Sequence, residues 1–471
     1  MPPQPSAERF VGITVMPEYF QVEGVEGVLD RLAARAGATA IATSPYVMEP
    51  APDGQGSREP PADAGAGKVR LLDRPLWGRR ELFVRTAPSF VPNRARYAGL
   101  RYQPPAADAL TAAAGGILGR ALDAARARGM KVYLQVQAAI PPGYRVQFGG
   151  PVAEDRPLLP DGAAPALRVD NNASLAAAAV TDYNRAMVAD LIRAYPQIDG
   201  LRIDWPEYPP YSLDAAFFDF NPQALAVARG LGLDVERMRI EASALRSWLL
   251  GGLDGASLEG WHSLDQLFGA AGLRDLAALK AHLAERVLAD FRAALDDAGG
   301  RHVALVPNAF PPPWTALSGF RPAAAARHAQ GASVKLYTMH WPMILRGWAE
   351  AILAGNPHLA GDPRLPKALA RIFGLSDGEP SGELADWRYP EPEEPHPVGA
   401  AAQAAKIAAA RAEAGAMPVY ALAHGYGPLA DVEARLAIAW RASGGRLWVN
   451  RYGYLSDEKL SAIGRVTGKM P

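Results

Sequence analysis

Short apolar runs rich in β-branched and aromatic residues alternate along the chain with longer Ala/Leu/Arg segments of helical period. The short runs predict buried strands, and the longer segments predict amphipathic helices. We predict eight strands, at residues 10–15, 38–43, 131–137, 200–204, 302–307, 333–338, 418–423 and 446–450. Helices are predicted between most of them, at residues 25–36, 107–128, 175–195, 277–298, 400–414 and 431–442. Such an alternation is typical of parallel βα units.

Eight parallel βα units are the number that closes a (β/α)₈ TIM barrel. We therefore expect an α/β fold, with a single barrel spanning residues 1–471 and a doubly wound open sheet as the structural alternative. The weakest helix is the one after strand five, because the prolines at 311–313 delay its start until about Arg321.

Three stretches are longer than a barrel needs, and we read them as insertions at about residues 50–106, 213–273 and 375–397. Residues 50–68 are rich in Pro, Gly, Asp and Ala and predict a mobile loop. The second insertion predicts extra helices, and the third is acidic and Pro-rich. All three follow the carboxyl end of a predicted strand, which is the face on which barrels carry their sites.

The composition and charge of the chain limit the classes of ligand and cofactor that it is expected to bind. Lys+Arg and Asp+Glu are 49 each, so no net charge attracts a nucleic-acid backbone or an anionic membrane. The absence of cysteine excludes thiolate metal sites, iron–sulfur clusters and a cysteine nucleophile. The N-terminus lacks the basic and apolar regions of a signal peptide, so a cytoplasmic location is expected. The oligomeric state stays open.

Polar and aromatic side chains gather just after the predicted strands. Hydroxyl, amide, imidazole and carboxylate groups bind the edge of a polyhydroxylated ring, and aromatic faces pack against its C–H surface. The sequence therefore predicts an oligosaccharide or glycoside as substrate. The predicted substrate-binding residues are Glu18, Tyr46, Gln137, Arg202, Trp205, Tyr208, Asn308, His340, Trp341, His424, Asn450 and Tyr452.

The densest motif is IDGLRIDWPEYPPY at residues 198–211. Arg202 and Asp204 are two apart on a strand and share a face, so the guanidinium should keep Asp204 ionised. Partial burial between aromatic residues should raise the pKa of Glu207. Two carboxyl groups with separated pKa values are what glycoside hydrolysis needs, so Asp204 and Glu207 are the predicted catalytic pair. The alternative is a structural Arg202–Asp204 ion pair with Glu207 in solvent.

The chain resembles the (β/α)₈ glycoside hydrolases and the hypothetical glycoside-hydrolase-like barrels. In these proteins Asp-Gly begins strand four, an Asp ends it, and a proline/aromatic segment and a helical insertion follow; residues 199–204, DGLRID, match this pattern. The segment GLRID is also similar to the GxRxD of α-amylase-type enzymes. That resemblance implies that Asp204 is the nucleophile.

The resemblance does not identify the second carboxylate. Amylase-type enzymes carry a Glu after strand five where this chain has Asn308, and other glycosidases carry a Glu after strand seven where it has His424. The candidates for the second carboxylate, in order, are Glu207, Glu18, Glu379, Glu383 and Asp386. A barrel that binds sugar without turnover is therefore the second hypothesis.

Two further chemistries are weighed against the hydrolase. Lys335 is a candidate Schiff-base lysine of a lyase or aldolase, although a mid-strand lysine is more often the partner of an interior carboxylate. His340 and His424 lack the spacing of metal-binding motifs, so no metal is expected. No Gly-rich phosphate loop follows a strand, and no cofactor is expected.

Overall fold

The computed structural model describes residues 9–61, 70–165 and 170–468, and its core is a closed barrel of eight parallel strands. Around the barrel the strands run in the order β1, β11, β10, β9, β8, β7, β6 and β2. Their bounds are β1 Phe10–Thr14, β2 Ala40–Thr43, β6 Lys131–Gln137, β7 Gly200–Asp204, β8 Ala304–Ala309, β9 Ala332–Leu336, β10 Val419–His424 and β11 Arg446–Asn450. Closure through β1, which pairs with both β2 and β11, confirms the predicted TIM barrel and excludes the doubly wound sheet.

All eight predicted strands overlap a barrel strand, with shifts at some ends. β8 begins at Ala304 rather than at residue 302, and β9 ends at Leu336 rather than at residue 338. The predicted helix at 400–414 coincides with α14. The helices nearest to the other predictions are α2 Val25–Arg31, α3 Ala109–Ala114, α4 Gly116–Ala127, α5 Ala178–Ala194, α9 Ala271–Asp297, α11 Pro322–Ala325 and α15 Leu429–Ala442.

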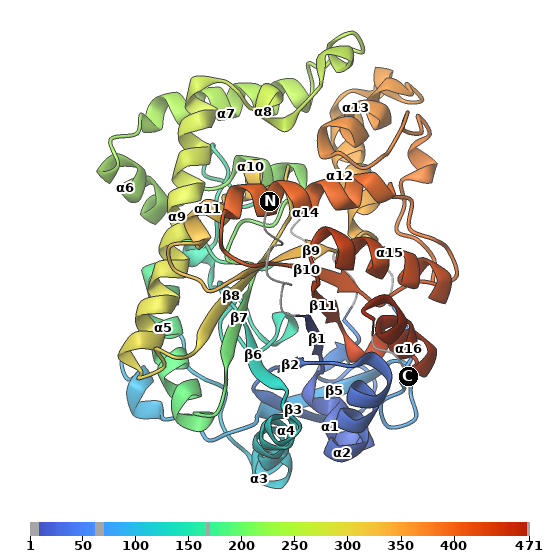
Figure 1. Ribbon diagram of the computed structural model, residues 1–471. Coiled ribbons are helices and arrows are strands. Elements are labelled where there is room, and N and C mark those ends of the chain that lie inside the picture. Colours follow the sequence, from blue (N-terminus) through green and yellow to red (C-terminus); the bar gives the residue numbers. More distant parts are fainter. Residues whose placement is uncertain (1–8, 62–69, 166–169, 469–471) are drawn as a thin grey trace, which may run out of the picture.

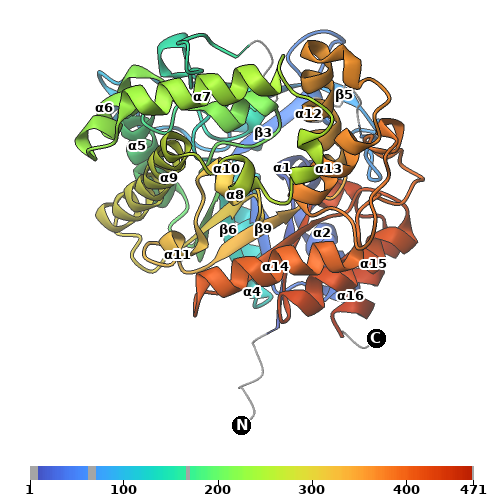
Figure 2. The same ribbon diagram turned by 90° about the horizontal axis from the view of Figure 1, so that it is seen from above.

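The remaining helices gather mainly at the carboxyl ends of the strands. α6, α7 and α8 lie with α12 and α13 across that end of the barrel (Figures 1 and 2). The bounds of these and the other helices are α1 Pro17–Glu23, α6 Pro222–Gly230, α7 Val235–Leu249, α8 Leu264–Leu267, α10 Thr315–Ser318, α12 His340–Gly355, α13 Arg364–Phe373 and α16 Asp457–Val466. Among the described residues, no helix is long and apolar enough to cross a membrane.

The segment predicted as a mobile loop at residues 50–68 is partly ordered, which corrects that expectation. A small antiparallel sheet in the order β3, β5, β4 uses β3 Tyr46–Ala51, β4 Ser57–Glu59 and β5 Leu82–Pro88. Glu59 is 1% exposed and forms ion pairs with Arg145 at 2.5 Å and with Arg451 at 2.8 Å. These long-range ion pairs hold a segment whose composition offers little apolar surface. Residues 62–68 of the prediction lie outside the described residues.

The barrel interior is filled by aromatic side chains that need glycine opposite them. The Trp448 ring packs edge-on against Phe10 and Tyr133, with ring centroids 5.2 Å apart in both pairs. Its six-membered ring lies against Gly12, where an added Cβ would come within 2.2 Å. Gly12 on β1 therefore makes room for the indole that fills the middle of the barrel.

Gly12→Ala should destabilise the protein by about 1–3 kcal/mol, because the new methyl group forces Trp448 out of its position in a closely packed core. Gly119→Ala in α4 is the matched control, since nothing lies within 4 Å of its added Cβ. In a helix interior that change should be neutral or stabilising, by up to about 1 kcal/mol. Urea unfolding of both variants measures the difference, and equal stabilities would contradict the packing argument.

Glu59→Gln should lower the free energy of unfolding by about 3–5 kcal/mol, because it leaves two buried guanidinium groups without their carboxylate. Glu81→Gln is the control, because Glu81 precedes β5 and its ion pair with Arg58 is roughly half exposed on both sides. Losing an exposed pair should cost less than about 1 kcal/mol. Thermal or urea unfolding gives both values; a Glu59→Gln protein as stable as the control would refute the anchoring role.

Candidate functional site

The carboxylate of Asp204 lies at the end of β7, inside the mouth of the barrel. Gln137 on β6 and Asn308 on β8 are its register neighbours, so the three side chains stand at one level. Asp204 Oδ1 is 2.6 Å from Lys335 Nζ on β9. The Lys335 side chain is only 1% exposed, whereas 16% of the Asp204 side chain reaches the surface. Burial lowers the pKa of Lys335, and the charge of Asp204 opposes that shift.

Arg202 is not the direct partner of Asp204, which corrects the prediction from the motif. Its guanidinium donates to Thr14 Oγ1 at 3.2 Å and to Asn308 Oδ1 at 2.9 Å. It also lies 4.0 Å from the centre of the Trp448 ring. Burial lowers the pKa of Arg202 to about 10, with opposing effects from Tyr337 and Asp204. The ammonium group of Lys335 therefore supplies the ion pair that the sequence assigned to Arg202.

Glu207 lies three residues beyond Asp204 but in a sealed environment. One carboxyl oxygen accepts a hydrogen bond from the Phe310 backbone N–H and the other from the Ser318 hydroxyl, both at 2.6 Å. The side chain has no exposed surface. Burial raises the pKa of Glu207 to about 7, against the opposing charge of Lys335 and the two hydrogen bonds. The pKa of Glu207 is therefore raised, as the sequence predicted, but because the side chain is completely rather than partly buried.

Trp205 connects the two carboxyl groups and has a strained backbone. Its φ of +51° lies in the left-handed region, which costs a non-glycine residue about 1–3 kcal/mol. Asn172 Nδ2 holds the turn by donating to the carbonyls of Trp205 and Glu207, at 3.1 and 2.8 Å. The strained conformation brings the Trp205 ring to 4.9 Å from Lys335 Nζ and 5.9 Å from the Tyr211 ring.

Tyr337, which follows β9, brings together three of the predicted site residues. Its ring lies 5.5 Å from that of His340 and 5.2 Å from that of His424. Its hydroxyl accepts a 2.7 Å hydrogen bond from Asn450 Nδ2. His340 also reaches the Asp204 side of the mouth, since its Nδ1 is 3.1 Å from the hydroxyl of Tyr211. Tyr337 itself was not predicted, because the predicted strand at residues 333–338 included it, whereas β9 ends at Leu336.

Several buried polar atoms at the strand ends lack a hydrogen-bond partner. Gln137 Oε1, Thr43 Oγ1 and Asn172 Oδ1 are in this state. An unpaired buried oxygen costs about 1–3 kcal/mol unless a ligand or water satisfies it. Gln137 is level with Asp204 on the neighbouring strand, and Asn172 bonds to the backbone carbonyl of Trp205, the residue after Asp204. Such an arrangement suits a ligand with several hydroxyl groups.

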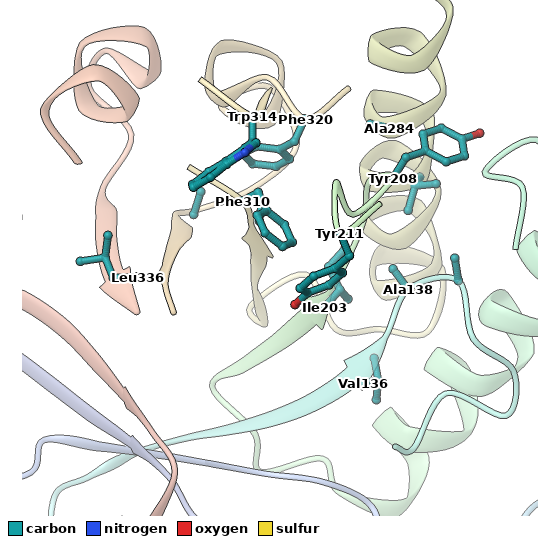
Figure 3. Close-up of a cluster of buried hydrophobic side chains, with 14 of the residues drawn as sticks. Val136, Ala138, Ile203, Tyr208, Tyr211, Ala284, Phe310, Trp314, Phe320 and Leu336 are labelled. Atoms are coloured by element: carbon teal, nitrogen blue, oxygen red, sulfur yellow. The ribbon is translucent and has the colours of Figure 1, made fainter. Parts of the chain in front are cut away.

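Of the five Tyr and Trp residues predicted to bind substrate, four are at most 1% exposed. Tyr208 points toward α9 (Figure 3), and its hydroxyl donates to Asp219 Oδ2 at 2.9 Å. Trp341 is fully buried, with its ring 5.4 Å from that of Trp314. Tyr452 is buried and donates to Glu23 Oε2 at 2.8 Å. The Tyr46 hydroxyl is also internal and donates to Glu18 Oε2 at 3.1 Å. Their aromatic character serves packing rather than an open stacking face.

Glu18 belongs to a buried charged cluster with Tyr46, Arg145, Glu59 and Arg451. Arg145 Nη1 donates to the Tyr46 hydroxyl at 2.8 Å and lies 3.4 Å from Glu18 Oε1. Burial raises the pKa of Glu18, and Arg145 opposes the shift. The sequence analysis missed Arg145, Glu59 and Arg451, because no local pattern marks residues that meet only through the fold.

The acidic insertion surrounds a separate hollow of about 570 Å³, lined by residues that include Glu379, Asp386, Trp387 and Arg388. Glu379 forms an ion pair with Lys367 at 2.9 Å, and Asp386 accepts from the Ser381 hydroxyl. Glu383, the remaining acidic candidate, is the residue before a short 3₁₀ turn in the same segment. Across the described parts of the chain, no group of three or more His, Asp or Glu could hold a metal ion.

Solved structures share the fold at low sequence identity. The catalytic domain of a β-amylase from Paenibacillus polymyxa superposes with a TM-score of 0.51 at 10% identity, covering 98% of this chain and 99% of that one. A β-galactosidase from Marinomonas ef1 gives 0.49 at 11% identity, over 97% of this chain and 58% of that one. A class V chitinase from Pseudomonas fluorescens Pf-5 gives 0.41 at 11%, over 98% and 100%. Neither a protein-family model nor a curated protein matches the sequence. The likeness to the β-amylase domain shows that this chain shares its barrel fold.

Proposed function

We propose that this protein is a glycoside hydrolase that cleaves its substrate at the barrel mouth, with Asp204 as the charged catalytic carboxylate. The observation that carries the proposal is the position of Asp204. It is the partly exposed carboxylate at the end of a barrel strand, and the ammonium group of Lys335 lies 2.6 Å away. A nearby cation favours the ionised form of a carboxyl group. An anion in this position can attack the anomeric carbon or stabilise its oxocarbenium-like transition state.

The surroundings of Asp204 support a sugar as the substrate. The unpaired oxygens of Gln137, Thr43 and Asn172 can accept hydrogen bonds from hydroxyl groups. The partly exposed rings of Trp205 and Tyr337, which follow the barrel strands β7 and β9, supply aromatic surface. The fold shared with a β-amylase domain supports this proposal.

Glu207 is the proposed general acid. A pKa of about 7 leaves roughly half of the carboxyl groups protonated at neutral pH. Such a group can deliver a proton to the leaving oxygen of a glycoside. Because Ser318 and Phe310 engage both oxygens of Glu207, proton delivery requires the segment that carries them to release the carboxyl group.

The sealed position of Glu207 also favours a second candidate, a carbohydrate-binding barrel without turnover. A barrel of this kind would keep the hydrogen-bonding groups and the aromatic surface but would lack a proton donor at the bond to be cleaved. Calorimetric binding of an oligosaccharide that remains intact after prolonged incubation with the protein would identify this function.

Asp204→Asn should lower turnover by at least about a thousandfold, which corresponds to about 4 kcal/mol of lost transition-state stabilisation. Asp219→Asn is the control, because Asp219 is a buried aspartate that accepts a hydrogen bond from Tyr208 outside the mouth. It should change turnover only a few-fold. The assay is a panel of nitrophenyl glycosides and natural oligosaccharides, with melting temperatures to confirm folding. Near-normal turnover by folded Asp204→Asn protein would remove Asp204 from the chemistry.

The pH profile tests the role of Glu207. A general acid must be protonated, so kcat/KM should fall as the pH rises through about 7, the pKa of Glu207. In Glu207→Gln that alkaline limb should disappear, and the rate should drop least for dinitrophenyl glycosides, whose leaving group needs no proton. If the limb persists unchanged in the variant, the acid is another residue.

A further inference from the structure

Three lysines in the described part of the chain are almost fully buried and have a pKa lowered by that burial: Lys280, Lys335 and Lys406. Burying an ammonium group is costly, so each needs a reason for its position. The groups in contact with the three amines differ, and this difference distinguishes two structural lysines from the third.

Lys280 and Lys406 cap backbone carbonyls. Lys280 Nζ donates to the carbonyl oxygens of Ala215, Ala216 and Leu317, at 2.8, 3.1 and 2.7 Å. Lys406 Nζ donates to the carbonyl of Phe373 at 2.5 Å and lies 4.3 Å from the centre of the Trp314 ring. These hydrogen bonds hold helix ends and turns together, which is a structural role for a lysine.

Lys335 has different surroundings. It projects from the middle of a barrel strand, and among the described residues its Nζ makes no hydrogen bond to a backbone carbonyl. Its close polar contact is the carboxylate of Asp204, and the rings of Trp205 and Phe310 lie 4.9 and 5.7 Å away. Asp204 keeps part of its side chain exposed, so a small molecule that reaches this carboxylate is one hydrogen-bond length from the amine.

We propose that Lys335 is a nucleophile that forms a reversible imine with a hydroxylated aldehyde or ketone, such as the open-chain form of a sugar. The carboxylate of Asp204 can take up a proton from the amine, and the aromatic rings limit the access of water to the adduct. The unpaired Oε1 of Gln137, level with Asp204, is available for a hydroxyl group of the ligand. This activity goes beyond glycoside hydrolysis and does not depend on it.

The step balances without an oxidant or reductant. A proton passes from the Lys335 ammonium to Asp204, and the free amine attacks the carbonyl carbon, so that a C–N bond forms and the oxygen becomes a hydroxyl group. Asp204 then returns its proton to that hydroxyl group, the C–O bond breaks, and water leaves. The products are one protonated imine and one water from one ammonium group and one carbonyl compound.

The same two residues then have two states. With the proton on Lys335, Asp204 is an anion that can serve the proposed hydrolysis. With the proton on Asp204, Lys335 is an amine that can attack a carbonyl group. The lowered pKa of Lys335 brings the second state closer to neutral pH than for an exposed lysine.

The test is reductive trapping on the wild-type protein. The folded chain is incubated with glyceraldehyde and then with sodium borohydride, and peptide mass spectrometry locates the reduced adduct. We expect the peptide with Lys335 to be modified at least about tenfold more than those with Lys280 and Lys406, whose amines are capped by carbonyls. Adduct on the exposed Lys131 without adduct on Lys335 would overturn the proposal. Trapping of pyruvate but not of glyceraldehyde would overturn the assigned class of ligand.

Variants provide a second measurement. Lys335→Arg keeps a cation beside Asp204 but cannot form an imine, so the site-specific adduct should be lost. Lys406→Arg is the matched control and should trap as the wild type does, and Asp204→Asn should slow trapping by about tenfold or more. Unchanged trapping rates in folded Asp204→Asn protein would remove the carboxylate from the step. Glycoside turnover is measured separately, so a wild-type protein that hydrolyses glycosides without forming the adduct refutes the imine alone.

Discussion

The barrel is built around a guanidinium group that has no contact with solvent. Arg202 lies in the interior between Thr14, Asn308 and the face of Trp448, and all three are neutral partners. Burying a cation with only neutral partners costs free energy, and the packing around Arg202 has to offset that cost. Trp448 can lie across the barrel only because Gly12 leaves room for it. Asp204, two residues farther along the strand and on the same face, supplies a negative charge that acts on Arg202.

Asp204 and Glu207 are three residues apart, yet their carboxyl groups have very different environments. Asp204 stays on the inner face of the barrel, where Lys335 from β9 meets it and part of it remains exposed. The left-handed turn at Trp205 then directs the chain outward, and Glu207 is enclosed by Phe310 and Ser318. One carboxyl group is partly exposed and held beside a cation, whereas the other is fully buried, and that burial raises the pKa of Glu207.

The sequence was sufficient for the barrel, because strand and helix periodicity depend on neighbouring residues. It was also sufficient to place Asp204, Gln137, Asn308, His424 and Asn450 near the carboxyl ends of barrel strands, whereas His340 is the first residue of α12. It failed where long-range contacts decide the outcome. The order of the segment around Glu59 comes from Arg145 and Arg451, which are far away in the chain. The partner of Asp204 is likewise a lysine from another strand rather than the arginine two residues away.

Aromatic residues were a second source of error, for a physical reason. A Trp or Tyr after a strand can cover the barrel top from inside or offer a face to a ligand, and the two uses have the same local sequence. Trp341 and Tyr208 are used for packing, whereas Trp205 and Tyr337 keep some exposed surface at the mouth. Whether such a ring is buried depends on the helices that cover the carboxyl ends of the strands. One of these, α12, was not among the helices predicted from periodicity.

The central claim is that the reactive centre of this protein is the Asp204–Lys335 pair at the mouth of the barrel. A crystal structure of the Asp204→Asn variant with an oligosaccharide found by the glycoside screen tests it most directly. The account predicts a sugar ring whose anomeric carbon lies about 3–3.5 Å from the side chain at position 204, the separation expected of reacting atoms. A sugar bound only in the hollow of the acidic insertion, with the barrel mouth empty, would contradict it.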